Sequence, residues 1–182
     1  AVDNQHSNED ERSFARISTA ISKYWITKRA PYLVFEALEC HGGPGYIEES
    51  IMPRLYREAP LNSIWEGSGN VMCLDVLRAL QRDKNALPSL FRELASAKGS
   101  NKNFDESFSH LKETLQDPID LEVEARLLTE KMACLIQASI FIKSGEEEKI
   151  SAFCNSRLGP RWSGAFGTLP TDTSFEYILG GL

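Results

Sequence analysis

The chain has 182 residues, 42% of them hydrophobic, which is enough for one packed domain or for one domain with a helical appendage. Its formal net charge of −6 argues against a general polyanion-binding protein. The four cysteines, Cys40, Cys73, Cys134 and Cys154, lie far apart with no Cys-x-x-Cys pair, so the sequence predicts neither a zinc site nor a disulfide scaffold.

The sequence starts Ala-Val-Asp-Asn-Gln-His-Ser, without an initiator methionine and without the apolar core of a signal peptide. No apolar run reaches the roughly 18 residues that a membrane-spanning helix needs. We therefore expect a soluble protein with no membrane partner, located in the cytoplasm or, in a eukaryote, in mitochondria. The polar start also suggests a fragment or a processed chain.

The first predicted helix covers about residues 8–40, because apolar side chains recur at three-and-four spacing from Phe14 to Leu38. Pro31 removes one backbone donor, so we expect a kink or a break there. The glycines of the segment 42–45 then end the helix and form a turn.

Two more helices follow before residue 84. A short one is expected near residues 48–57, with Pro53 limiting its regularity. A longer one begins at Ser63 or within 65–67 and runs to about Arg82. Its predicted apolar stripe consists of Val71, Leu74, Leu77 and Leu80.

The remainder of the chain predicts further helices at about residues 87–97, 105–116, 121–144 and 146–157. The tail, residues 158–182, contains several glycines and is expected to be an ordered loop or a frayed end. No strand pattern occurs, so the predicted fold class is all-α.

Two motifs stand about twenty residues apart: His41-Gly-Gly-Pro-Gly-Tyr46, and Ile64-Trp-Glu-Gly-Ser-Gly-Asn70 before an apolar helix. A glycine turn lets backbone N–H groups approach a phosphate or a ring closely, and a helix N-terminus favours an anion nearby. The second motif therefore places Glu66 where an ionised base would be held.

The stretch from Tyr32 to Leu80, with both motifs and an Arg-x-x-Arg-Glu segment between them, resembles the C-terminal helical domain of flavin-dependent acyl-CoA dehydrogenases. The sequence Trp-Glu-Gly-Ser-Gly-Asn is similar to the corresponding motif of the AidB branch of that family. The predicted domains are a C-terminal-domain bundle over residues 1–84, incomplete at its N-terminus, and an AidB-like helical extension over residues 85–182. Family members carry a helical and a β-domain ahead of this region, so the resemblance implies those domains as partners and an incomplete enzyme in isolation.

The resemblance implies oxidation of an acyl-CoA thioester to the enoyl-CoA, a step of fatty acid metabolism with FAD as hydride acceptor. A base in this reaction must be ionised, near the substrate and partly desolvated. Glu66 matches the family position of that base. The alternative is that Glu66 only charges the start of the following helix, an effect worth about 0.3–1 kcal/mol.

The resemblance also implies cofactor-binding residues. Gly42 and Gly43 match glycines that approach the flavin of a neighbouring subunit, which implies a homo-oligomer, a tetramer or a dimer. Glu39 stands where many members carry glutamine, Ser68 replaces the commoner threonine and keeps a hydroxyl, and Asn70 is a further candidate.

Three other side chains near the motifs have structural alternatives. Arg54 and Arg57 resemble family arginines that more often form ion pairs, here with Glu58 or a neighbour, than bind substrate. Trp65 either walls the acyl pocket or anchors the helix in the core.

AidB-type proteins carry an added C-terminal helical region and are linked with DNA binding. From residue 85 onward the chain has ten Lys and Arg against fourteen Asp and Glu, whereas a DNA surface needs a basic excess. DNA is therefore a partner that the charge does not favour. Two functions stay open: an acyl-CoA dehydrogenase, which Glu66 favours, and an AidB-like flavoprotein for DNA binding or alkylation-damage protection with vestigial dehydrogenase activity, which the motif wording and the extension favour.

Overall fold

The computed structural model describes residues 2–6, 8–116, 121–160, 162 and 164–180. Every regular element within these ranges is helical, which confirms the all-α fold class. The elements are η1 (Val2–Asn4), α1 (Glu9–Cys40), α2 (Gly43–Tyr46), α3 (Met52–Glu58), η2 (Ala59–Ser63), α4 (Gly69–Arg82), α5 (Ala86–Ala95), α6 (Lys102–Gln116), α7 (Ala125–Ser144), α8 (Glu147–Arg157) and α9 (Phe175–Leu179).

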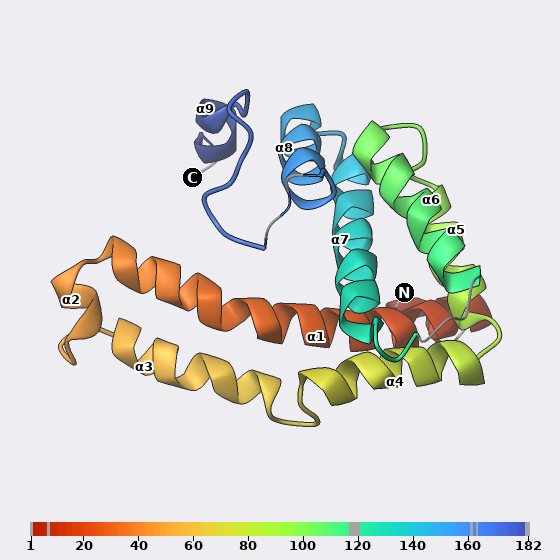
Figure 1. Cartoon of the computed structure of the whole chain (residues 1–182), viewed down its shortest axis with the longest axis horizontal. Coiled ribbons are helices and arrows are strands. Elements are labelled where there is room, and N and C mark those ends of the chain that lie inside the picture. Colours follow the sequence, from red (N-terminus) through yellow and green to blue (C-terminus); the bar gives the residue numbers. More distant parts are fainter. Residues whose placement is uncertain (1, 7, 117–120, 161, 163, 181–182) are drawn as a thin grey trace.

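A long helical hairpin forms the base of the molecule. Helix α1 runs along its full length, and α3, η2 and α4 return beside it in the opposite direction (Figure 1). Helices α5, α6 and α7 stand across one half of this hairpin, and α8 packs against α7. We call the other half, residues 26–64, the arm. Its first residues line a pocket with α7, α8 and the tail, and its far end extends away from the bundle.

Of the kink or break predicted at Pro31, the break does not occur: α1 is continuous from Glu9 to Cys40. The missing N–H of a proline removes a single intrahelical bond, and contacts with neighbouring elements compensate for it. Helix α1 packs against α3 and η2 along the arm, and against α4, α5 and α7 beyond it.

Several helix boundaries differ from the prediction. Helix α3 begins at Met52, so Pro53 lies in its first turn, where a missing N–H has no intrahelical acceptor to lose. Helix α4 begins at Gly69, later than predicted, because the preceding turn contains left-handed backbone. The stripe was also wrong at Val71, which is exposed, while the buried face of α4 is formed by Met72, Cys73, Val76, Leu77 and Ala79.

One hydrophobic core spans both predicted domains. It joins Ile17 of α1 and Val76 of α4 to Leu90 of α5, Phe104 of α6 and Leu135 of α7. The predicted boundary at residues 84 and 85 falls in the short connection between α4 and α5. Residues 85–182 are therefore packed on residues 1–84 through a continuous apolar interior.

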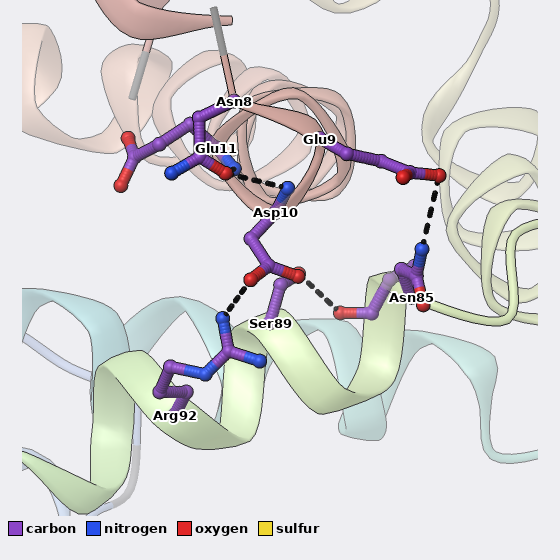
Figure 2. Close-up of polar contacts among 8 residues, drawn as sticks. Asn8, Glu9, Asp10, Glu11, Asn85, Ser89 and Arg92 are labelled. Atoms are coloured by element: carbon purple, nitrogen blue, oxygen red, sulfur yellow. Dashed lines mark hydrogen bonds and ion pairs between the residues drawn. The ribbon is translucent and has the colours of Figure 1, made fainter.

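Polar contacts tie the N-terminus of α1 to α5 (Figure 2). The Asn8 side chain caps α1 by accepting a hydrogen bond from the backbone N–H of Asp10 at 2.9 Å. The Asp10 carboxylate pairs with Arg92 of α5 at 2.5 Å, and Glu9 accepts a hydrogen bond from Asn85 at 3.2 Å. Residues before and after the predicted domain boundary thus form polar contacts that join the start of α1 to α5.

The buried cysteines lead to a prediction about thiol reactivity. Burial raises the pKa of the Cys134 thiol to about 12 and that of Cys154 to about 11, and it also raises the pKa of Cys73, whereas Cys40 is exposed. Because the thiolate is the reactive form, we expect a disulfide reagent at neutral pH to label only Cys40 until denaturant is added. A Cys40→Ser variant is the control, and rapid labelling of that folded variant would contradict the prediction.

Candidate functional site

The turn between η2 and α4 presents Glu66 in an unusual backbone conformation. Its φ is +61°, the left-handed region, and Gly67 follows with φ +118°. Non-glycine residues in this region carry strain of order 1–3 kcal/mol, and such strain is concentrated at functional sites. The turn is closed by hydrogen bonds from the N–H groups of Trp65 and Gly67 to the carbonyls of Leu61 and Ile64.

Lys23 of α1 holds this turn. Its Nζ donates to the backbone carbonyl of Trp65 at 2.5 Å and lies 3.0 Å from Oε2 of Glu66. The Glu66 side chain is 82% exposed in this chain, so the ion pair by itself contributes little stability, but it orients the carboxylate. Glu66 does not cap α4, whose N-cap position is Ser68. Trp65 is 65% exposed and does not anchor the helix in the core.

Glu66 lies on the lining of a groove of about 820 Å³ between η1, the first half of α1, and α4. Its apolar lining includes Ala15, Ala20, Met72 and Ala79, and its charged lining consists of Arg12, Arg16, Lys23, Arg78, Glu66 and Asp75. The volume lies within the range of small-molecule sites, which combine an apolar surface with a few polar groups. The groove therefore places the Glu66 carboxylate beside small apolar side chains and four cationic ones.

The start of α4 is held by α7 of the extension. Asn70 accepts a hydrogen bond from Nε of Arg126 at 2.6 Å, so its side-chain oxygen already has a protein partner. Gly69 is buried, and a Cβ there would lie 2.5 Å from Cε of Lys28. Ser68 is exposed and its hydroxyl makes no capping bond.

The glycine turn lies at the far end of the arm. Gly42 has φ +62°, and a Cβ at either Gly42 or Gly43 would meet no atom within 4 Å, so the backbone here is open to an approaching group. Glu39 is exposed on the last turn of α1. Gly45 is different, because its Cβ would lie 2.3 Å from the carbonyl oxygen of Leu38.

The candidate residues thus form two separate groups within one chain. Glu39 is near the end of α1 and Gly42 and Gly43 are at the start of α2, whereas Glu66 and Ser68 are in the turn between η2 and α4. Figure 1 shows α2 at the tip of the arm, far from the start of α4. From Lys23 to the end of α1 the helix extends about 25 Å at 1.5 Å per residue. One chain therefore does not bring the glycine turn and Glu66 to the same ligand.

The arm exposes large apolar side chains along its length. They include Tyr32 and Leu33 of α1, Tyr46 and Ile47 at the turn, and Leu55, Tyr56, Leu61 and Ile64 on the return. Extended apolar surfaces of this kind mark sites of protein association. The backbone of Gly42 and Gly43 and the exposed hydroxyl of Ser68 are open to an approaching group.

The arginines of the arm form the predicted ion pairs. Arg54 pairs with Glu58 at 3.0 Å, and Arg57 makes a bidentate contact to Glu48 at 2.7 and 3.2 Å. This contact lowers the pKa of the Glu48 carboxyl and fastens the turn after the glycines to α3. Lys23 and Arg126, in contrast, were not identified from sequence, because neither belongs to a motif and each meets its partner across a long stretch of chain.

The described part of the chain contains no cluster of His, Cys, Asp and Glu that would hold a metal ion. Within the same residues, no helix is both long and apolar enough to cross a bilayer.

Comparison with known proteins places these observations in a family. Residues 1–81 match the family described as acyl-CoA dehydrogenase, C-terminal domain. The chain is 38% identical over 157 residues to the putative acyl-CoA dehydrogenase AidB of Escherichia coli K12, covering 86% of this chain and 29% of that protein. It is 34% identical over 113 residues to acyl-CoA dehydrogenase family member 11 of Caenorhabditis elegans, covering 62% of this chain and 18% of that protein.

Solved structures show the same likeness. A crystal structure of Caenorhabditis elegans ACDH-11 in complex with C11-CoA superimposes with a TM-score of 0.72 at 25% identity, covering 84% of this chain and 30% of that one. The apo form of Bd2924 gives a TM-score of 0.65 at 30% identity, covering 76% of this chain and 27% of that one. The chain thus spans less than a third of the relatives that it matches.

Proposed function

Because the chain belongs to the acyl-CoA dehydrogenase family, whose C-terminal domain it matches over residues 1–81, we propose that it forms the base-bearing part of an FAD-dependent acyl-CoA dehydrogenase of the AidB-like type. The observation that carries the proposal is the placement of Glu66. The fold holds this carboxylate in a left-handed turn, pairs it with Lys23 and presents it on an open groove.

In the proposed reaction Glu66 removes a proton from the carbon next to the thioester carbonyl. Lys23 positions the carboxylate through its hydrogen bonds to the backbone carbonyl of Trp65 and to the side chain of Glu66. A bound FAD would supply the acceptor for the hydride that leaves the neighbouring carbon. Proton removal by a carboxylate requires exclusion of water, and the 82% exposure of Glu66 means that substrate or other protein segments must cover it.

We further propose a homo-oligomer in which the arm of one copy reaches the site of another. Gly42 and Gly43 would then contact the flavin that lies nearest Ser68 of the second copy, with Glu39 beside them. Two observations support this arrangement: the candidate residues are separated within one chain, and the arm exposes a long apolar surface.

A second candidate is an AidB-like flavoprotein acting in DNA binding or alkylation-damage protection, with vestigial dehydrogenase activity. The likeness to AidB favours it, because the alignment covers 86% of the chain and therefore includes much of the extension. The acidic balance of residues 85–182 argues against a DNA surface there.

An anaerobic titration with acyl-CoA tests the proposed reaction. The flavin-loaded protein that contains this chain is mixed with short branched or long straight acyl-CoA, and the visible flavin absorbance is followed. We expect the absorbance to bleach as the flavin is reduced. Bound flavin that never bleaches would favour the second candidate, and a protein that takes up no flavin would contradict both.

A further inference from the structure

A second pocket, of about 560 Å³, lies where the middle of α1 meets α7, α8 and the tail. We call it the Arg29 pocket. Its principal lining residues are Trp25, Arg29, Phe141, Phe153, Arg157 and Phe166. It shares no lining residue with the groove beside Glu66, and it contains none of the positions that the sequence motifs single out.

Aromatic rings surround the guanidinium of Arg29. Its Cζ lies 4.3 Å from the ring centre of Phe166 and 5.6 Å from those of Trp25 and Trp162. Its Nη1 donates to the backbone carbonyl of Gly164 at 2.8 Å. Cation–π contacts and this hydrogen bond hold the side chain between α1 and the tail.

Arg157, at the end of α8, brings a second guanidinium to the same cluster. Its Cζ lies 4.4 Å from the ring centre of Trp162. Its Nη1 is buried and has no hydrogen-bond partner in the described structure. Burial lowers the pKa of Arg157, and the neighbouring charge of Arg29 lowers it further. A buried donor without an acceptor is unfavourable, particularly on a charged group.

No acidic side chain is among the described residues that line the pocket, whereas Arg29, Lys149 and Arg157 are. Glu146 pairs with Lys149 at 2.6 Å. Glu130, outside the lining, accepts a hydrogen bond from Nε1 of Trp162 at 2.7 Å and so lies behind the ring that both arginines contact. The lining of the cavity therefore combines apolar walls with an excess of positive charge.

We propose that the Arg29 pocket binds an aliphatic carboxylate of medium chain length, separate from any acyl-CoA in the groove beside Glu66. The carboxylate pairs with the guanidinium of Arg157 and is further stabilised by Arg29, both of which line the pocket. The alkyl chain lies against Phe141, Phe153 and Ile178. The ligand thus offsets the positive charge of the lining and covers its apolar walls.

Tryptophan fluorescence of the full chain tests the proposal, with decanoate as the probe. The chain has three tryptophans, and Trp25 and Trp162 contact Arg29 of the pocket, so a Trp65→Phe background isolates the pocket signal. We expect a saturable change that fits one decanoate per chain. Decanol lacks the charge and acetate lacks the chain, and each should bind at least about tenfold more weakly.

Two variants and a control connect binding to the pocket. Arg157→Gln should weaken decanoate binding about tenfold or more, because a charge-assisted hydrogen bond is lost. Leu169→Glu, on the partly exposed lining, should do the same by placing a carboxylate near both arginines. Lys98→Gln removes the same charge at an exposed site outside the pocket and should change the affinity by less than about twofold.

Circular dichroism establishes whether each variant is folded. If Arg157→Gln does not fold, the decanoate affinity of Leu169→Glu tests the proposal. The proposal is overturned if the folded parent chain gives no saturable response to decanoate. It is overturned as well if decanol binds as tightly as decanoate, or if a folded pocket variant keeps the parental affinity.

Discussion

Replacing Glu66 with glutamine is expected to lower kcat for acyl-CoA oxidation by about 10²- to 10⁴-fold, the range over which a positioned general base contributes. Glutamine keeps the shape of the side chain and cannot accept the proton. It also keeps the Cβ, so the left-handed φ of +61° is equally strained in both proteins and the fold should be unchanged. Single-turnover flavin bleaching measures the effect on the chemical step directly.

Glu58→Gln is the matched control, because Glu58 is exposed on α3, pairs with Arg54 and does not line the groove. It should leave the bleaching rate within about twofold of the parent protein. A Glu66→Gln protein that holds flavin and still bleaches at the parental rate would show that the base lies elsewhere. If the parent protein binds a nucleic acid and Glu66→Gln keeps that binding, the second candidate function does not depend on the Glu66 carboxylate in the groove.

The second large effect is expected at Gly45, where alanine should destabilise the tip of the arm by about 1–3 kcal/mol, the usual range for overpacking. The added Cβ would lie 2.3 Å from the backbone oxygen of Leu38 and 2.9 Å from Cβ of His41. A backbone atom cannot rotate away, so the end of α1 must shift or open. Hydrogen exchange at residues 38–46 should therefore accelerate, even where the melting temperature of the bundle changes little.

Gly43→Ala separates this steric effect from cofactor contact. A Cβ at Gly43 meets nothing within 4 Å, so hydrogen exchange at the tip should stay close to that of the parent protein. If the backbone of Gly43 approaches a flavin of a second copy, the same methyl group should weaken flavin retention, measured by dialysis and flavin absorbance. A Gly43→Ala protein that retains flavin as the parent does would contradict the proposed arrangement, and unchanged hydrogen exchange in Gly45→Ala would contradict the packing argument.

The sequence was informative about the helices because their apolar side chains follow the helical period. The face of α7 from Ala125 through Leu128, Met132 and Leu135 is buried as the spacing predicts. Helix starts were less predictable. The start of α4 depends on the left-handed Glu66 and Gly67, and the continuity of α1 through Pro31 depends on packing against other elements. Neither condition is visible in a local pattern.

The candidate site likewise contains residues that the sequence predicted and residues that it did not. Its motif residues, Glu66 and the glycines at 42 and 43, were identified because their spacing is local and similar to that of a known family. Lys23 was missed because its partner, Glu66, is separated from it by 43 positions in the sequence. Arg126 was missed because its partner, Asn70, is separated from it by 56 positions. The pairing of such residues depends on how α1 and α7 lie against α4.

By itself, the sequence determined the all-α fold class and the family that the first part of the chain resembles. It also singled out the candidate site residues that belong to short motifs. These features depend on local periodicity and on neighbouring residue types. Only the tertiary structure decided that α1 continues through Pro31, that Glu66 is held by Lys23 on an open groove, and that the glycine turn lies far from it. It also brought Arg29 and Arg157 together around Trp162. Such contacts arise from long-range packing, in which the burial of one helix face fixes the positions of side chains that are distant in the sequence.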